Sequence, residues 1–113
     1  MKVKTREAGQ VVVFEISGQV MGGPDADTFH ELVKRHINEG KKQILINLGK
    51  VSWINSTGLG ILIAGYTSVQ DAGGQFKMAN ISGRIESILM VTKLAGIFET
   101  YETEEEALAS FSS

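Results

Sequence analysis

Val51-Ser52-Trp53-Ile54-Asn55-Ser56-Thr57-Gly58-Leu59-Gly60 is the stretch that decides the fold, because in it a buried strand is expected to turn into a helix. The first N–H groups of a helix have no partner within the helix, and the side chain of Asn55 or Ser56 can accept a hydrogen bond from one of them as an N-cap. The positive end of a helix also favours a phosphate, so a hydroxyl presented there is a candidate phosphorylation site. The local pattern leaves both interpretations open, and capping is the commoner one.

The residues on either side of this stretch predict a strand before it and a helix after it. Residues 43–48 are short, aliphatic and bounded by lysine and glycine, as in a central strand. Trp53, which follows that strand, is expected to pack under the sheet edge rather than to anchor an interface. From residue 57 to about 72 apolar residues recur at helical spacing, and Gly73-Gly74 ends the pattern. The stripe consists of Leu59, Leu62, Ile63, Tyr66 and Val69.

Two strands and a helix are expected before the central strand. Residues 11–16 are β-branched and mostly apolar, and Ala8-Gly9-Gln10 predicts a turn from an earlier strand over residues 3–7. Gly22-Gly23-Pro24 interrupts the chain, and proline suits the first turn of a helix. Apolar residues at helical spacing then continue until Gly40 supplies a stop. The chain therefore opens with a β-hairpin followed by an amphipathic helix.

The C-terminal part of the chain predicts two further strands and two helices. Residues 75–80 alternate as a strand does, and the next helix is expected to end near Leu94-Ala95-Gly96. A short strand follows over residues 98–101. Thr103-Glu104-Glu105-Glu106 fits a capping box, so we expect its glutamates to interact with the positive end of the last helix.

This order of elements predicts an α/β fold, with a mixed, largely parallel sheet of four to five strands and about four helices. In such sheets the loops at the carboxyl ends of parallel strands form the functional edge. Asn55-Ser56 lies on one of these loops and Met21-Gly22-Gly23 on another. A chain of 113 residues has the size of one domain, so residues 1–113 are expected to fold as a single unit.

The composition excludes several classes of function. The chain has 11 basic and 13 acidic residues and a formal net charge of −2, with no basic run for nucleic acid. It has no cysteine, which excludes disulfides and thiolate zinc sites and suits a reducing compartment. The longest apolar run, residues 59–64, is too short to span a bilayer, and no signal peptide is recognisable. We therefore expect a cytoplasmic protein that binds neither nucleic acid nor membrane.

Known catalytic patterns do not fit the sequence. A nucleophile elbow around Ser56 needs glycines two residues to either side, and Ile54 occupies the first of these positions. His30 and His36 lie on the first expected helix and receive no catalytic role. Ile63 stands where a dinucleotide fingerprint needs its third glycine. The scattered carboxylates do not form a metal cluster. We expect a protein that is not an enzyme and that holds no cofactor or metal.

Taken together, these residues resemble the STAS domain of bacterial anti-sigma factor antagonists over nearly the whole chain. Residues 44–48, the stretch from 51 to 60 and Gly73-Gly74 carry the resemblance. Its most specific part is Asn55-Ser56-Thr57-Gly58-Leu59-Gly60, which is similar to the family's Asp-Ser-Ser/Thr-Gly-Leu-Gly phosphorylation motif between the third strand and the second helix. The resemblance implies a STAS-like fold for the single domain.

The resemblance also implies a function, which is partner switching. An unmodified antagonist binds an anti-sigma factor serine kinase and so frees a sigma factor; the kinase phosphorylates the first hydroxyl of the motif, which ends binding, and a serine phosphatase reverses the change. Ser56 would carry the phosphate here, with Thr57 as a first-turn residue. The implied partner-binding edge consists of Met21, Gly22, Gly23, Asp25, Asn55, Ser56, Thr57, Gly58 and Leu59.

Two differences from the family pattern support alternatives. Asn55 stands where the family usually has aspartate, and it can cap a helix but carries no charge. Met21 lies near the place where the family often has an acidic residue. One alternative is therefore a constitutive, non-phosphorylated STAS scaffold in a larger regulatory complex. A rival from another class is a small ligand-binding or hydrolytic domain that uses Ser56 and a histidine. The sequence leaves the oligomeric state open, because an exposed first strand could pair or be protected by its charges.

Overall fold

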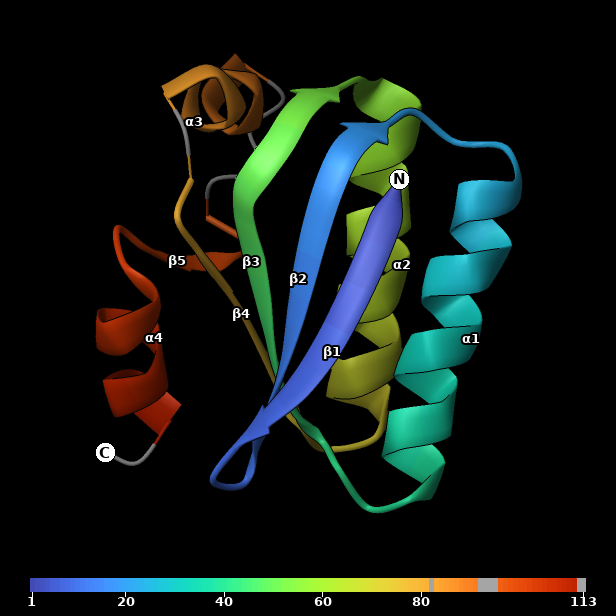
Figure 1. The fold of residues 1–113 in the computed structure, drawn as a ribbon, viewed down its shortest axis with the longest axis vertical. Helices are drawn as coiled ribbons and strands as arrows, with labels where there is room; N and C mark the ends of the chain where they lie inside the picture. The colour runs from blue at the N-terminus through green and yellow to red at the C-terminus, as the bar shows by residue number, and fades with distance from the viewer. Residues whose placement is uncertain (82, 92–95, 112–113) are drawn as a thin grey trace.

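The computed structural model describes residues 1–81, 83–91 and 96–111, in which a twisted β-sheet lies between helices (Figure 1). The predicted end of the third helix near Leu94-Ala95-Gly96 falls largely on residues 92–95, which lie outside the described residues. The elements are β1 (Lys2–Ala8), β2 (Val11–Val20), α1 (Pro24–Asn38), β3 (Gln43–Ile54), α2 (Ser56–Asp71), β4 (Gln75–Ala79), α3 (Gly83–Val91), β5 (Glu99–Tyr101) and α4 (Glu104–Phe111).

The strands of the described residues form one sheet in the order β1-β2-β3-β4-β5. β1 and β2 are the antiparallel hairpin that the sequence predicts, whereas the other three neighbouring pairs are parallel. Parallel neighbours need a crossover connection, and α1, α2 and α3 lie between them in the sequence. The prediction of an α/β fold with a mixed, largely parallel sheet is confirmed. The parallel order brings the carboxyl ends of β2 and β3 to the same edge.

Helices cover both faces of the sheet. α1 and α2 pack on one side, which we call the inner face, and α4 packs on the other, the outer face (Figure 1). Phe14 and Ile46 belong to the larger cluster, on the inner face. Val13, Leu45 and Phe111 belong to a smaller cluster beneath α4. Because β2 and β3 are buried on both faces along this part of their length, they appear in the sequence as continuous apolar runs.

β3 is longer than predicted. The sequence indicated an end at residue 48, but β3 continues to Ile54, so this boundary was wrong. Gly49-Lys50 does not form a turn, because β3 stays paired with β2 on both sides of it. The pairing register shifts twice, and at each shift β3 contains one more residue than β2. Such bulges let a strand bend while its pairing continues. The two extra residues together restore the alternation, so Ile54 returns to the inner core opposite Val20.

The sequence of β4 alternates between polar and apolar residues, but its side chains do not alternate between exposed and buried positions. Its four residues from Phe76 to Ala79 are all buried, including Lys77, which is 6% exposed. The predicted strand is present, but the alternation of its sequence is not matched by alternating exposure, because α4 covers the outer face of β4.

Lys77 of β4 binds the C-terminal end of α4. Its Nζ donates to the Ser110 Oγ at 2.9 Å and to the Ser110 carbonyl at 3.2 Å, and lies 3.2 Å from a carboxylate oxygen of Glu99. The same nitrogen lies 4.7 Å from the centre of the Phe111 ring. A cation is favourable both at the negative end of a helix and over an aromatic face. These contacts allow a lysine to replace an apolar residue between sheet and helix.

The other end of α4 is fastened by Glu104. The Glu106 N–H donates to the Thr103 Oγ at 3.2 Å, which is one half of the predicted capping box. Glu104 does more than face the helix dipole, because it binds Arg6 of β1 and accepts a hydrogen bond from the Asn47 side chain of β3 at 3.0 Å. α4 is therefore held by charged contacts at both ends.

We expect Lys77→Ala to lower the free energy of unfolding by about 2–4 kcal/mol, because it opens a cavity and removes the contacts that hold α4. Lys77→Met keeps most of the side-chain volume and loses the ammonium. It should cost less, since the desolvation of a buried cation offsets much of what its contacts contribute. Urea denaturation of both variants measures the difference, and a larger loss for Lys77→Met would contradict this account.

Candidate functional site

The loops that follow β2 and β3 meet at one edge of the sheet. Val20 and Ile54 are the last paired residues of these strands, and the Asn55 N–H donates to the Val20 carbonyl at 3.4 Å. Gly22 then passes against the first turn of α2, where a Cβ on Gly22 would lie 2.6 Å from the Thr57 methyl carbon. Gly22 also has φ +109°, which favours glycine. We call the surface formed by residues 21–23 and 55–57 the switch edge.

The structure decides which of Asn55 and Ser56 caps α2. Asn55 is the N-cap, with extended backbone, and its Oδ1 accepts a hydrogen bond from the Gly58 N–H at 2.8 Å. Ser56 is the first residue of α2 and its side chain is exposed. Because Asn55 does the capping, the Ser56 hydroxyl is available at the surface, beside the remaining N–H groups of the first turn.

Gly58 and Leu59 are buried beneath the surface of the site. A Cβ on Gly58 would lie 1.7 Å from the Val20 carbonyl oxygen, so α2 can approach β2 this closely only with glycine at that position. Leu59 is 2% exposed and lies in the larger core cluster. Of residues 55–59, therefore, Asn55, Ser56 and Thr57 reach the surface, while the Leu59 side chain is buried.

The positive end of α2 lacks the acidic residues that the other described helices carry. α1 has Asp25 and Asp27 in its first turn, α3 has Glu86, and α4 has three glutamates, whereas the first turn of α2 has none. The sequence has no charged residue from 51 to 70. A carboxylate or phosphate at a helix N-terminus is stabilising by about 0.3–1 kcal/mol when exposed. The start of α2 is thus a positive helix end without a compensating charge of its own.

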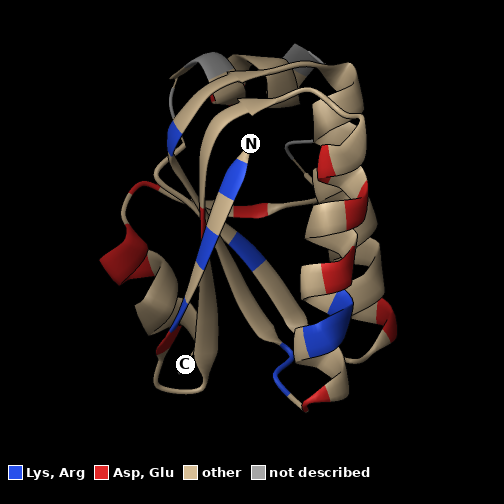
Figure 2. Cartoon of the chain, turned by 45° about the vertical axis from the view of Figure 1, so that its right-hand side comes forward, with Lys and Arg blue, Asp and Glu red and all other residues tan. Residues whose placement is uncertain are grey.

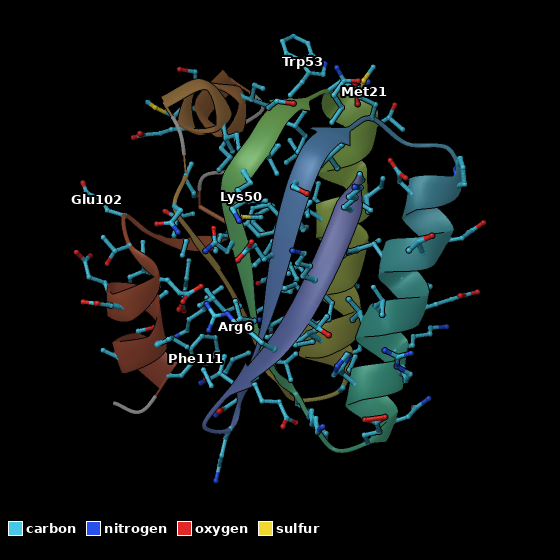
Figure 3. The ribbon with its side chains drawn as sticks, in the orientation of Figure 1. Arg6, Met21, Lys50, Trp53, Glu102 and Phe111 are labelled. Atoms are coloured by element: carbon cyan, nitrogen blue, oxygen red, sulfur yellow. The ribbon has the colours of Figure 1, made fainter. Side chains whose placement is uncertain are left out.

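Two large apolar side chains are exposed in this region, Met21 within the switch edge and Trp53 near it. Met21 is 45% exposed and Trp53 is 42% exposed, and both project at the end of the molecule where α2 begins (Figure 3). The expectation that Trp53 packs under the sheet edge is wrong. The second register shift of β3 places Trp53 opposite Gln19, so its side chain points away from the inner core that contains Ile54. The sequence could not show this, because the bulge has no distinct local pattern.

Asp25 and His36 are two of the other residues that the sequence singled out, and both lie on α1. Asp25, in the first turn of α1, lies with a carboxylate oxygen 3.5 Å from the amino group of Met1. His36 is buried on α1, where its Nδ1 lies 2.8 Å from the Leu32 carbonyl and its ring contacts Phe14. Among the described residues, no group of three His, Asp or Glu side chains could hold a metal ion. No described helix is both long and apolar enough to cross a bilayer.

Gly58→Ala should lower the free energy of unfolding by at least about 3 kcal/mol, because the added methyl group overlaps the Val20 carbonyl and forces α2 away from β2. Gly60→Ala is the matched control on the same helix, where no atom lies within 4 Å of the added Cβ. It should raise stability by about 0.5–1 kcal/mol through helix propensity. Thermal and urea denaturation measure both changes; equal stabilities of the two variants would be inconsistent with the close approach.

Comparisons with known proteins place this geometry in a family. The chain is 24% identical over 106 residues to the anti-sigma-B factor antagonist of Listeria monocytogenes, covering 94% of this chain and 91% of the relative. It is 36% identical over 72 residues to a Thermotoga neapolitana protein whose name places it among the anti-sigma factor antagonists, and this match spans 64% of the length of each protein.

Solved structures share the fold. A Thermotoga maritima protein, also named as an anti-sigma factor antagonist, superposes with a TM-score of 0.88 at 24% identity, covering 98% of this chain and 95% of the other. The phosphorylated form of the Bacillus cell fate determinant SpoIIAA superposes with a TM-score of 0.75 at 19% identity, covering 97% and 99%. The STAS domain model matches residues 2–107, nearly the whole length. By this match and this fold, the chain belongs to the STAS domain family.

Proposed function

We propose that this chain is an anti-sigma factor antagonist that acts by partner switching at the switch edge. In its unphosphorylated form it binds an anti-sigma factor serine kinase in the cytoplasm. Phosphorylation of Ser56 ends that complex, and a serine phosphatase restores it; the chain itself catalyses no reaction. The observation that carries the proposal is the exposed Ser56 hydroxyl at the one described helix start that has no acidic residue of its own.

The free protein can accommodate a phosphate at Ser56. The group adds a charge of about −1.5 to −2, and the first-turn N–H groups of α2 and the helix dipole both favour a negative charge there. The Asn55 side chain already satisfies the Gly58 N–H, so phosphorylation need not displace the cap. We therefore expect the modified domain to keep its fold and, if anything, to gain stability.

The same phosphate should disfavour a docked partner. The switch edge is neutral and includes the exposed side chain of Met21, and the exposed side chain of Trp53 lies near it, so a partner would meet small and apolar groups. Burial of an unpaired phosphate in such an interface costs several kcal/mol, and about 1.4 kcal/mol already weakens binding tenfold. One modification can thus stabilise the free domain and dissociate the complex.

Two comparisons support this proposal. The relative in Listeria is named for antagonism of an anti-sigma factor, and the chain matches it over most of its length. A protein of the same fold, SpoIIAA, has been solved in a phosphorylated form. Asn55 occupies the place where the family motif usually has aspartate, and its capping bond explains how the local geometry is kept without the carboxylate.

The test is a phosphorylation and capture experiment in extract of the source cells. With ATP, we expect phosphate on Ser56 of the wild type, no labelling of Ser56→Ala, and continued labelling of Thr57→Ala. With ADP, immobilised wild type and Ser56→Ala should each recover a kinase of the anti-sigma type, whereas Ser56→Glu should recover at least tenfold less. Thr67→Glu is the matched control, since it adds the same charge to an exposed position further along α2.

The alternatives predict other outcomes of the same experiment. If Ser56 stays unmodified and every variant recovers the same partners, the domain is a constitutive scaffold and the switch is absent. If Thr67→Glu loses the kinase as strongly as Ser56→Glu, the effect comes from net charge and not from the switch edge. Loss of folding in Ser56→Glu, measured by circular dichroism, would contradict the expectation that a negative charge at the start of α2 stabilises the folded domain.

A further inference from the structure

The outer face of β1 carries a row of cations. Lys2, Lys4 and Arg6 pair with Ser17, Glu15 and Val13 of β2, and Val13 belongs to the cluster beneath α4, so all three cations lie on that same face. Lys50 of β3 pairs with Ser17 and is also exposed there. Figure 3 shows Arg6 and Lys50 directed to the side of the sheet on which α4 lies. We call Lys2, Lys4 and Lys50 the basic patch.

The basic patch is not covered by α4. α4 packs over β3, β4 and β5, and a hollow of about 490 Å³ separates it from the turn of the β1–β2 hairpin. Within the patch, the hydrogen bond from the Lys50 ammonium at 2.8 Å, with the nearby charges of Lys50, Lys4 and Arg6, lowers the pKa of the Glu15 carboxyl. One carboxylate therefore lies among several cations, and the surface retains an excess of positive charge.

The start of α4 forms an acidic surface beside the basic patch. Glu102, Glu105 and Glu106 are exposed, and we call them the acidic patch. Glu104, within the same segment, binds Arg6 of β1, so the two patches are neighbours joined by an ion pair. Figure 2 shows the cations along β1 and the acidic start of α4 on one side of the molecule. The outer face is thus divided into a raised acidic half and a flat basic half.

From this arrangement we propose that two copies of the chain associate through their outer faces about a two-fold axis that passes near the Arg6–Glu104 contact. A two-fold rotation about such an axis exchanges neighbouring patches, so the acidic patch of each copy lies on the basic patch of the other. The raised α4 of one copy fills the space over the uncovered β1 of its partner. A second copy is the favoured occupant, since this chain carries both complementary halves.

The dimer is independent of the proposed partner switch. Ser56 lies at the edge formed by the carboxyl ends of β2 and β3, not on the face between α4 and β1. Exposed charge pairs are worth little individually and are screened by salt, so we expect a weak dimer that dissociates as ionic strength rises.

The first measurement is the sedimentation equilibrium of the purified chain at two ionic strengths. At about 0.01 M, where charges act over about 30 Å, we expect dimers at high protein concentration. At about 1 M, where the range falls to about 3 Å, the dissociation constant should rise at least tenfold. A chain that stays monomeric at low ionic strength, up to millimolar concentration, would overturn the proposal.

A charge exchange tests the specific contact. Lys2→Glu/Lys4→Glu makes both halves of the face acidic, and Glu102→Lys/Glu105→Lys makes both halves basic. Each double variant should be monomeric at low ionic strength, and an equimolar mixture of the two should recover a dimer. No single-copy function of these residues predicts recovery by mixing.

The matched control places the same change of charge on another surface. Lys34→Glu/Arg35→Glu alters two exposed cations of α1, on the opposite side of the sheet, and should leave the wild-type dimer intact. Two mixtures with Glu102→Lys/Glu105→Lys are then compared. The mixture that contains Lys34→Glu/Arg35→Glu should form at least tenfold fewer heterodimers than the mixture that contains Lys2→Glu/Lys4→Glu. Equal recovery in both mixtures would show that net charge alone drives association and would overturn the assignment of the interface.

Discussion

The switch edge depends on the close approach of α2 to the end of β2. Gly58 brings the helix backbone so near the Val20 carbonyl that no larger residue fits. With α2 fixed in this way, its first turn lies directly beside the loop after β2. Gly22 in that loop can lie against Thr57 because it too lacks a side chain. The position of Ser56 thus follows from two glycines that contribute no chemistry of their own. Tight backbone packing gives the hydroxyl a fixed place on the surface.

The distribution of charge over the molecule connects this geometry with function. The switch edge is neutral, and α2 begins without an acidic residue, whereas the outer face carries dense charges of both signs. On the neutral edge a single phosphate would become the dominant charge, so its effect on binding would be large. On the outer face one further charge would be a small addition to many. The proposed regulation by phosphate and the proposed association by charge pairs would therefore use different surfaces of one small domain.

The irregular pairing of β3 with β2 shapes both surfaces. Each register shift adds a residue to β3, and together they carry Lys50 and Trp53 to the outer side while Ile54 returns to the inner core. A regular strand of the same length could not expose both side chains and also pair its last residue with Val20. Bulges of this kind are a common means of redirecting side chains near functional sites.

Much of the fold and of the candidate site could be predicted from the sequence, since the deciding signals were local. Apolar periodicity, glycine stops and the polar residues at the start of α2 specified the order of the elements, the parallel sheet and a helix capped by Asn55 or Ser56. The structure decided that Asn55 is the cap and that Ser56 is exposed. The length of β3, the exposure of Trp53 and the burial of Lys77 were decided only by tertiary structure. Each of them depends on which element lies opposite: β2 extends β3 through irregular pairing, and α4 covers Lys77 while leaving β1 open. Periodicity records which side chains share a face of their own element, but what packs on that face is determined by residues far away in the chain.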